Sequence, residues 1–144
     1  MELKRISYSS LNPRQKENFN FQKISAILAD FGFVTLRLSD DWQGADFIAL
    51  HIDGVTVARV QLKSRLTFNE NYRGKGLWIA FSDRESWYLY PHDEFLDQLL
   101  DIKTIGSSSS WSVQGLYSIP KLTKQLLGLL EKYRISGDAN PVAE

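Results

Sequence analysis

The chain has 144 residues, 43% of them hydrophobic and 24% charged, which fits one globular domain and excludes wholesale disorder. It has no cysteine, which excludes disulfides, thiolate zinc sites and cysteine nucleophiles, and two histidines are too few for a histidine-rich metal site. Lys plus Arg and Asp plus Glu number 17 each, giving a formal charge of zero. Any attraction to a polyanion must therefore come from a local patch.

The first part of the chain predicts a helix followed by a strand. Asn12 is a typical helix cap, Pro13 suits the first helical position, and Gly32 is a typical helix end. Apolar residues recur between them at helical spacing. Residues 33–38 alternate and are rich in strand formers, whereas the polar residues 39–44 predict a loop.

Two apolar runs, 44–52 and 55–63, flank Asp53 and Gly54, a pair typical of a two-residue hairpin turn. A turn centred on that pair would place opposite each other residues whose numbers add up to 107. Both faces of this ribbon are mostly apolar, which predicts that other parts of the protein cover it on both sides.

The predicted register brings three polar side chains to one end of the ribbon. Asp46 falls opposite Gln61, and Lys63 shares the face of Gln61 because side chains alternate along a strand. Directly opposed side chains have Cβ atoms about 5 Å apart, close enough to share a metal ion or a phosphate. We therefore expect Asp46, Gln61 and Lys63 to form a site.

The second part of the chain predicts the remaining elements of one mixed fold. They are a polar loop over 64–76, strands over 77–81 and 87–90, a helix opened by Pro91 with His92 exposed at its start, a Ser-rich loop over 105–110, a short strand over 116–119 and a helix opened by Pro120. We expect one domain over 1–135 and a flexible tail over 136–144. The order of elements predicts an α/β fold with a mixed central β-sheet flanked by helices.

The order helix, strand, Gly-Ala-Asp-Phe-Ile, hairpin, Val-Gln-Leu-Lys-Ser resembles the PD-(D/E)XK nuclease superfamily, and within it the archaeal Holliday-junction-resolvase type. The resemblance covers roughly residues 13–90 and lies in order and spacing more than in identity. It implies a restriction-endonuclease-like core and a metal-dependent nuclease that hydrolyses phosphodiester bonds, of DNA more than of RNA.

The resemblance also implies a role for each matching residue. Asp46 and Gln61 would bind Mg²⁺ or Mn²⁺ through side-chain oxygens, and the backbone carbonyl of Leu62 would complete the ligand set. Lys63 would orient the attacking water and offset charge at the phosphate. A polar residue of the first helix would assist, and we expect Gln22, which borders the apolar stripe, in preference to Glu17. Small nucleases of this type often act as homodimers, and the sequence leaves that point open.

Two residues depart from the family pattern. Gln61 stands where the family has Glu or Asp, so the expected site has one firm anion and a weaker attraction for metal. Ala45 replaces the proline that usually precedes the first Asp. Asp40 or Asp41 would supply the missing charge if their loop folds back onto the site.

The stretch 63–75 is locally basic and carries aromatic residues between its charges, a pattern that suits nucleic acid because phosphates take the charge and bases stack on rings. The residues expected to bind nucleic acid are Arg65, Tyr72, Arg73 and Lys75. A solvated surface loop is the simpler interpretation of the same charges.

Two other functions fit the sequence. The first is a nuclease-fold module that binds nucleic acid or a protein partner without cutting, which the neutral charge and Gln61 favour. The second is a protein-only interaction domain such as an immunity or antitoxin factor. No charged start leads into an apolar segment and no apolar run approaches about 18 residues. We therefore expect a cytoplasmic protein without a membrane partner.

Overall fold

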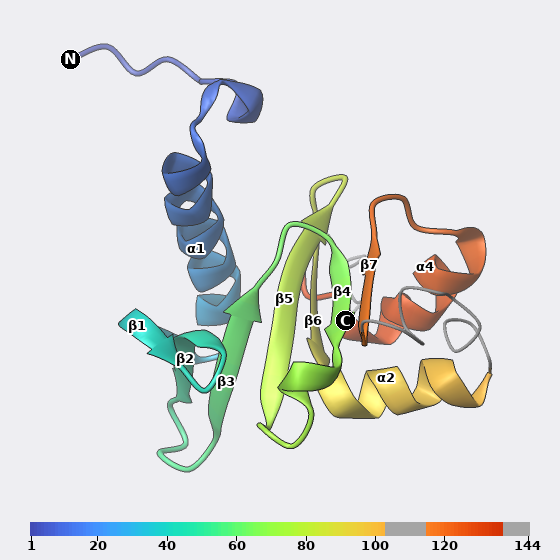
Figure 1. Cartoon of the computed structure of the whole chain (residues 1–144). Coiled ribbons are helices and arrows are strands. Elements are labelled where there is room, and N and C mark those ends of the chain that lie inside the picture. The colour runs from blue at the N-terminus through green and yellow to red at the C-terminus, as the bar shows by residue number, and fades with distance from the viewer. Residues whose placement is uncertain (103–114, 137–144) are drawn as a thin grey trace, which may run out of the picture.

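A computed structural model describes residues 1–102 and 115–136 of the protein. Figure 1 shows its helices and strands, which in chain order are η1 (Tyr8–Ser10), α1 (Pro13–Asp30), β1 (Phe33–Trp42), β2 (Ala45–His51), β3 (Val57–Leu62), β4 (Leu66–Asn69), η2 (Glu70–Tyr72), β5 (Leu77–Asp83), β6 (Ser86–Pro91), α2 (His92–Asp101), β7 (Leu116–Ile119), α4 (Lys124–Leu130) and η3 (Glu131–Tyr133). The expected Ser-rich loop over 105–110 lies outside the described residues, as does the expected tail apart from residue 136.

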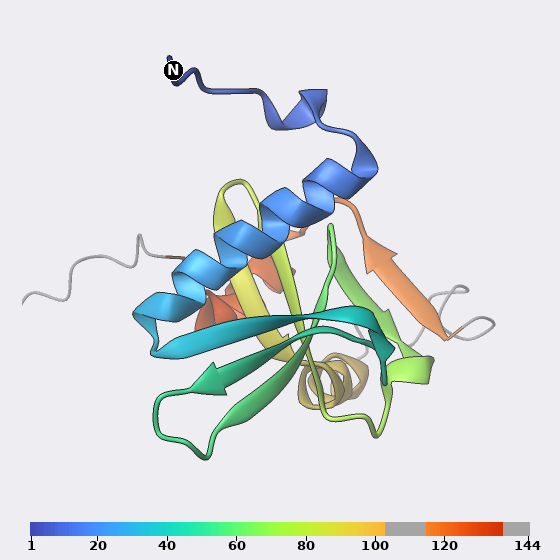
Figure 2. The same cartoon turned by 90° about the vertical axis from the view of Figure 1, so that its left-hand side faces the viewer.

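The main sheet has five strands in the order β1-β2-β3-β5-β6, and only the β3–β5 pair is parallel. Strands β4 and β7 form a second, antiparallel sheet. Helix α1 crosses one face of the main sheet, as Figure 2 shows, and α2 and α4 lie on the opposite side. The expected α/β class, with a mixed central sheet flanked by helices, is confirmed.

The protein has one hydrophobic core on each side of the main sheet. Between α1 and the sheet, the buried residues are Ile24, Leu28, Phe47, Ala49, Ala58, Val60, Ala80 and Trp87. On the other side, β5 and β6 pack against α2, α4 and the small sheet, and the largest fully buried side chains there include Phe68, Phe81, Tyr90 and Phe95. The Tyr90 hydroxyl donates to the Thr67 carbonyl at 2.6 Å, which ties the two sheets together.

The hairpin register predicted from the sequence is confirmed, but the turn is not the predicted one. Residues of β2 and β3 pair so that their numbers add up to 107, from Phe47 with Val60 to Leu50 with Val57. The ladder ends at His51, whose N–H donates to the Thr56 carbonyl. A longer loop follows because the Asp53 carboxylate accepts hydrogen bonds from the backbone N–H groups of residues 55 and 56.

A tight turn lies instead at Gln43–Gly44, where the sequence had predicted the end of a polar loop. Trp42 pairs with Ala45, and both turn residues have positive φ, 55° and 84°, as a type I′ hairpin requires. A Cβ atom on Gly44 would lie 2.9 Å from Leu77 Cδ1, so a larger residue there would also displace the end of that side chain. The expected loop over 39–44 is therefore wrong, since β1 continues to Trp42.

Two further expectations about the elements are wrong. Residues 66–69 form the buried strand β4 rather than part of a polar loop, because β7 pairs with it from about fifty residues away. The last helix begins at Lys124 rather than at Pro120, because the Thr123 side chain caps it by accepting from the Leu126 N–H.

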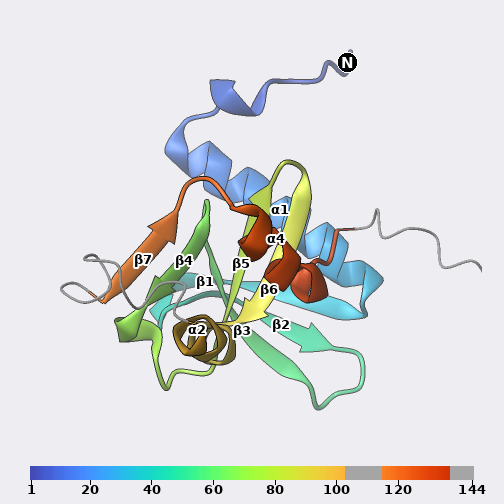
Figure 3. The same cartoon turned by 90° about the vertical axis from the view of Figure 1, so that its right-hand side faces the viewer.

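The prediction that the hairpin is covered on both sides is also wrong. Helix α1 covers one face of β1, β2 and β3, but α2 and α4 pack over β5 and β6 and leave the other face of the first three strands open. Figure 3, viewed from the side of α2 and α4, shows the β2–β3 hairpin extending beyond both helices. Among residues 1–102 and 115–136, none of the helices combines the length and the apolar composition of a membrane span.

Candidate active site

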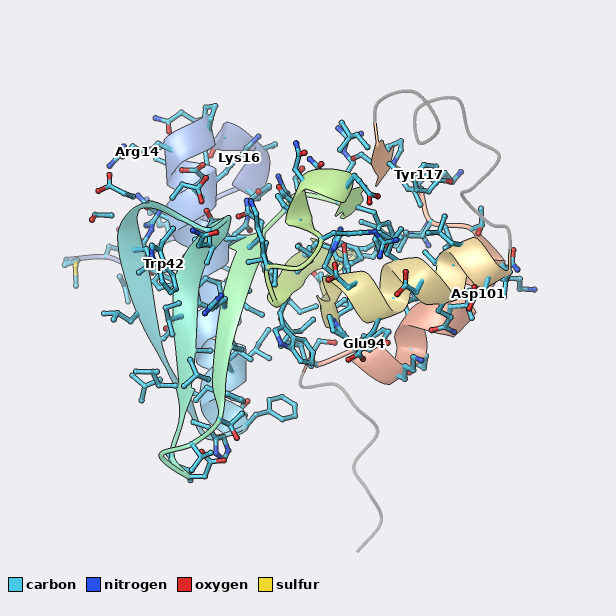
Figure 4. The ribbon with its side chains drawn as sticks, turned by 60° about the horizontal axis from the view of Figure 1, so that its bottom comes forward. Arg14, Lys16, Trp42, Glu94, Asp101 and Tyr117 are labelled. Atoms are coloured by element: carbon cyan, nitrogen blue, oxygen red, sulfur yellow. The ribbon has the colours of Figure 1, made fainter. Side chains whose placement is uncertain are left out.

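A cavity of about 940 Å³ lies between the N-terminal half of α1 and the adjoining ends of β1, β2 and β3. Its ionisable lining residues are Arg14, Lys16, Glu17, Arg37, Asp40, Asp41, Asp46 and Lys63, together with the Tyr8 phenol. In Figure 4, Arg14 and Lys16 lie at the start of α1, on the side of the molecule that carries Trp42 and away from Glu94 and Asp101 of α2. The cavity therefore mixes four cationic and four acidic side chains in one concave surface.

Backbone pairing between the strands is interrupted at Asp46, and this interrupted part of the sheet forms the floor of the cavity. On one side, four residues of β1, Leu38 to Asp41, stand against the single residue Asp46 of β2, which is a large bulge. On the other side, the Leu62 N–H donates to Asp46 Oδ2 at 2.8 Å instead of to the backbone of β2. The Leu62 carbonyl points to the same side of its strand as that N–H, toward β2. The Asp46 carboxylate thus lies where both neighbouring ladders are interrupted.

The surroundings of Asp46 disfavour its charge on balance. Partial burial raises the pKa of Asp46 above its ordinary value of 3.8, while the hydrogen bond from Leu62 and the Lys63 ammonium lower it. The carboxylates of Glu17 and Asp41 raise it further by repulsion. Carboxylates of α1 and β1 therefore both act on Asp46 of β2 at the cavity, and the Leu62 N–H and the Lys63 ammonium offset them in part.

Lys63 and Asp46 line the same cavity, as the predicted register required. The Lys63 Nζ atom lies 5.5 Å from the centre of the Tyr72 ring, a cation–π contact that directs the ammonium group. The Tyr72 ring in turn meets His92 edge-on, with ring centres 5.4 Å apart. The Tyr72 ring of η2 therefore lies between the Lys63 ammonium of the cavity and His92 at the start of α2.

His92 is fully buried, contrary to the prediction that it is exposed. Its Nε2 atom accepts from the Asn69 N–H at 3.0 Å, and its Nδ1 atom lies 2.8 Å from Asp93 Oδ1. The second oxygen of Asp93 accepts from the Gly74 N–H at 2.9 Å. Burial lowers the pKa of His92, and Asp93 offsets this only in part, so the ring is neutral at pH 7 with its proton on Nδ1.

The structure brings some of the predicted site residues together and leaves others apart. Asp46, Leu62, Lys63 and Glu17 line the cavity, and so do Asp40 and Asp41. Gln61 is half-buried and Gln22 is exposed, and neither is part of the cavity wall. Among the polar candidates of α1, Glu17 is the one that acts on Asp46, because it lies more than one turn nearer to the open end of the sheet.

The predicted basic loop is held to the rest of the protein by the Arg73 side chain and by the backbone of Lys75. Arg73 forms ion pairs of 2.9 Å with both Glu70 and Asp97, and the Lys75 carbonyl accepts from Arg59 Nη1. Arg65 is exposed between β3 and β4. None of Arg65, Arg73 and Lys75 lines the cavity, and Tyr72 reaches it only through Lys63.

Sequence reasoning missed the cations on the α1 side of the cavity. Arg14 and Lys16 come from the first turns of α1, and Arg37 comes from β1, where its guanidinium lies over the Phe21 ring and donates to Asn18. The signal available in the sequence was their position: residues 14 and 16 precede Glu17 on one end of a capped helix. Because these residues lie far from the 63–75 stretch in the chain, the sequence did not indicate that they share a cavity with Lys63.

No group of three or more His, Cys, Asp or Glu side chains within the described ranges is arranged as a preformed metal site. The donor set at the cavity nevertheless suits a hard cation. One Asp46 oxygen is taken by the Leu62 N–H, and the carboxylates of Glu17 and Asp41 repel Asp46. Mg²⁺ needs only one or two carboxylates because water and phosphate complete its shell.

Comparisons with known proteins find similarity only at the level of structure. No family model matches the chain, and no curated protein matches it. A Holliday junction resolvase from Archaeoglobus fulgidus is 15% identical, with a TM-score of 0.39 over 49% of this chain and 74% of its own. A bacterial homing endonuclease is 17% identical, with a TM-score of 0.48 over 85% of this chain and 86% of its own. Because both similarities are weak, a function for this protein must be argued from its own residues.

Proposed function

We infer that the protein is a metal-dependent nuclease whose active site is the cavity at the open end of the sheet. One observation carries this inference: Asp46 and Lys63, 17 residues apart in the chain, line the same cavity. The N–H of Leu62, the residue before Lys63, donates to the Asp46 carboxylate and holds it there. An acid and an amine joined in this way match the order that the sequence shares with the PD-(D/E)XK nucleases. The preferred substrate is DNA.

Each residue has a distinct task in phosphodiester hydrolysis. Asp46, with Glu17, would hold Mg²⁺ or Mn²⁺, which stabilises charge on the phosphate and lowers the pKa of a bound water. The Leu62 N–H fixes the Asp46 side chain. The Lys63 ammonium, directed by Tyr72, offsets negative charge at the scissile phosphate and orients the attacking water. Arg14, Lys16 and Arg37 attract neighbouring phosphates.

Gln61 has a supporting task in this proposal. It precedes Leu62 on β3 outside the cavity wall, and its amide oxygen would be a neutral donor that binds a metal ion less strongly than a carboxylate does. Glu17 supplies the second negative charge that Gln61 lacks. On this account Glu17→Gln lowers cleavage more than Gln61→Glu changes it, and Gln22→Ala leaves cleavage unchanged.

The test is cleavage of labelled single-stranded, duplex and branched DNA and of RNA, with Mg²⁺, with Mn²⁺ and with a chelator. We expect metal-dependent cleavage, and a loss of about 100-fold or more in Lys63→Ala. Lys124→Ala, at the exposed start of α4, is the matched control and retains full activity. Binding of nucleic acid without cleavage under any condition would support the non-cutting module, and no binding at low salt would support the protein-only domain.

A further inference from the structure

The first half of α1 carries a row of cations and aromatic rings. Lys16, Phe19 and Lys23 recur at the spacing of helix turns, so they lie on one face of α1. Tyr8 of η1 packs between Lys16 and Phe19: the Lys16 Nζ atom lies 5.4 Å from the centre of the Tyr8 ring, and the two ring centres are 5.3 Å apart. The Lys23 Nζ atom lies 5.2 Å from the centre of the Phe19 ring and ends the row. We call these four residues the cation–ring row.

The cation–ring row is held in place and begins at the cavity. The Tyr8 hydroxyl accepts a hydrogen bond from Asn20 Nδ2 at 2.9 Å, which fixes η1 on the helix. Tyr8, Lys16 and Asn20 line the cavity, whereas Phe19 and Lys23 do not. The row therefore leads from the cavity along α1, and the Tyr8 ring at its start remains 41% exposed.

The segment before the cation–ring row adds two further cations. We call residues 1–6 the N-terminal arm. Its Lys4 and Arg5 are exposed, and so is the apolar Ile6, at 63%. In the part of the chain that the structure describes, the arm has one ion pair, between Lys4 and Glu2 at 3.8 Å, and a pair so exposed contributes little. In Figures 1 and 2 the arm lies beyond the start of α1, apart from both sheets.

Charge is distributed unevenly along this neutral chain. Residues 1–23 contain five basic and two acidic side chains, a net charge of +3, so the rest of the chain carries −3. Among the described residues, neither Lys16 nor Lys23 lies within ion-pair distance of a carboxylate. In the 63–75 stretch, by contrast, Arg73 is held in two ion pairs. The local basic patch that a neutral protein needs in order to attract a polyanion is therefore at the start of the chain.

We propose that the cation–ring row and the N-terminal arm bind the phosphate backbone of a nucleic acid strand where it leaves the cavity. Lys16 and Lys23 lie about 10 Å apart along the helix, the length of about three nucleotide steps of duplex DNA, so they contact separate phosphates. The Tyr8 ring, exposed beside the cavity, offers a surface on which a base can stack. The inference rests on the proposed function in taking nucleic acid as the partner, but it does not require cleavage.

The test measures how the affinity for a labelled DNA duplex depends on salt, with a chelator present so that no strand is cut. Each phosphate contact makes the fall of log K with log salt steeper by about 0.9. We expect Lys23→Ala to weaken binding and to lower this slope by about 1, and Lys4→Ala/Arg5→Ala to lower it by about 2. Lys124→Ala, at the exposed start of α4, is the matched control and leaves the affinity and the slope unchanged.

A charge-preserving variant separates a phosphate contact from an effect on the helix. Lys23→Arg keeps the charge and should keep the slope, and circular dichroism verifies that every variant retains the native helix content. Native slopes in both Lys23→Ala and Lys4→Ala/Arg5→Ala overturn the proposal. A native chain that binds polyglutamate as tightly as DNA also overturns it, because the patch would then suit an acidic protein.

Cleavage assays distinguish a failure of this inference from a failure of the proposed function. A protein that shows the expected slopes but never cuts contradicts the nuclease and supports the inference. A protein that cuts with metal, while the variants of the row and the arm bind like the native chain, supports the nuclease and contradicts the inference. The absence of any DNA binding at low salt contradicts both.

Discussion

Asp46 and His92 are both polar side chains whose pKa values are shifted by the protein. The two regions differ in whether neighbouring groups satisfy the polar side chain or repel its charge. Every ring nitrogen of His92 has a partner, and Asp93 passes the connection on to Gly74. Asp46 has one backbone donor and two repelling carboxylates nearby. The His92 region is arranged for stability, whereas the Asp46 region keeps unfavourable charge at an accessible cavity, which is typical of a functional site.

Replacing Asp46 by Asn has the largest expected effect in either region. We expect cleavage to fall on the order of 1000-fold, because the proposed cation loses its charged ligand. The free energy of unfolding at pH 7 rises slightly, by less than about 1 kcal/mol, since repulsion is removed and the solvent-facing position screens the gain. Assays of cleavage and urea unfolding measure both. Glu94→Gln, on α2, should change neither, and a destabilised Asp46→Asn protein would contradict this view of the site.

Replacing His92 by Leu tests the other region. The change leaves the Asn69 N–H without its acceptor and breaks the connection to Asp93, so we expect a loss of about 3 kcal/mol in the free energy of unfolding. Urea unfolding measures it. His51→Leu, at a half-buried histidine of β2, is the control and should cost clearly less. Equal losses in the free energy of unfolding at the two histidines would show that the hydrogen bonds of His92 do not contribute the expected stability.

The His92 region also makes the free energy of unfolding depend on pH. The pKa of His92 is lower in the folded protein than in the unfolded chain, where it is about 6.5. Between the two values the unfolded chain binds the extra proton, so stability is complete above about pH 6.5 and is lost as the pH falls through the folded pKa. Unfolding curves from about pH 7.5 to 5 should show this decline in the native chain and a flatter profile in His92→Leu.

Tyr72 connects the two regions and gives the smallest expected effect. Tyr72→Leu removes the ring beneath the Lys63 ammonium, and we expect kcat to fall about 5- to 10-fold, close to the worth of one cation–π contact. Tyr72→Phe keeps the ring and should keep kcat. The substrate KM stays unchanged in both if Tyr72 positions Lys63 rather than binding nucleic acid directly.

What the sequence predicted well were relations within the β2–β3 hairpin. Centring the reversal on Asp53 and Gly54 gave the right register, so Asp46 and Lys63 were expected together even though the loop is longer than a two-residue turn. The turn was misjudged because the Asp53 side chain serves residues beyond the expected turn.

What the sequence could not predict were relations between distant elements. Strand β4 is recognisable only beside β7, and His92 is buried only because Asn69 and the small sheet cover it. The choice of Gln22 over Glu17 rested on the apolar stripe of the helix, whereas the structure places Glu17 and not Gln22 in the cavity wall. Each of these depends on packing between segments that no short pattern connects.

The interruption of the sheet at Asp46 has a mechanical consequence. Residues 38–41 are anchored at Arg37 and at Trp42, which pair with Phe47 and Ala45, but between these anchors they have no ladder partners in β2 except across Asp46. Within this segment the Asp41 carboxylate accepts from the Gly44 N–H at 2.8 Å, which ties the bulge to the tight turn. On the function proposed above, a change in residues 38–41 would alter access to Asp46 without touching a residue of either hydrophobic core.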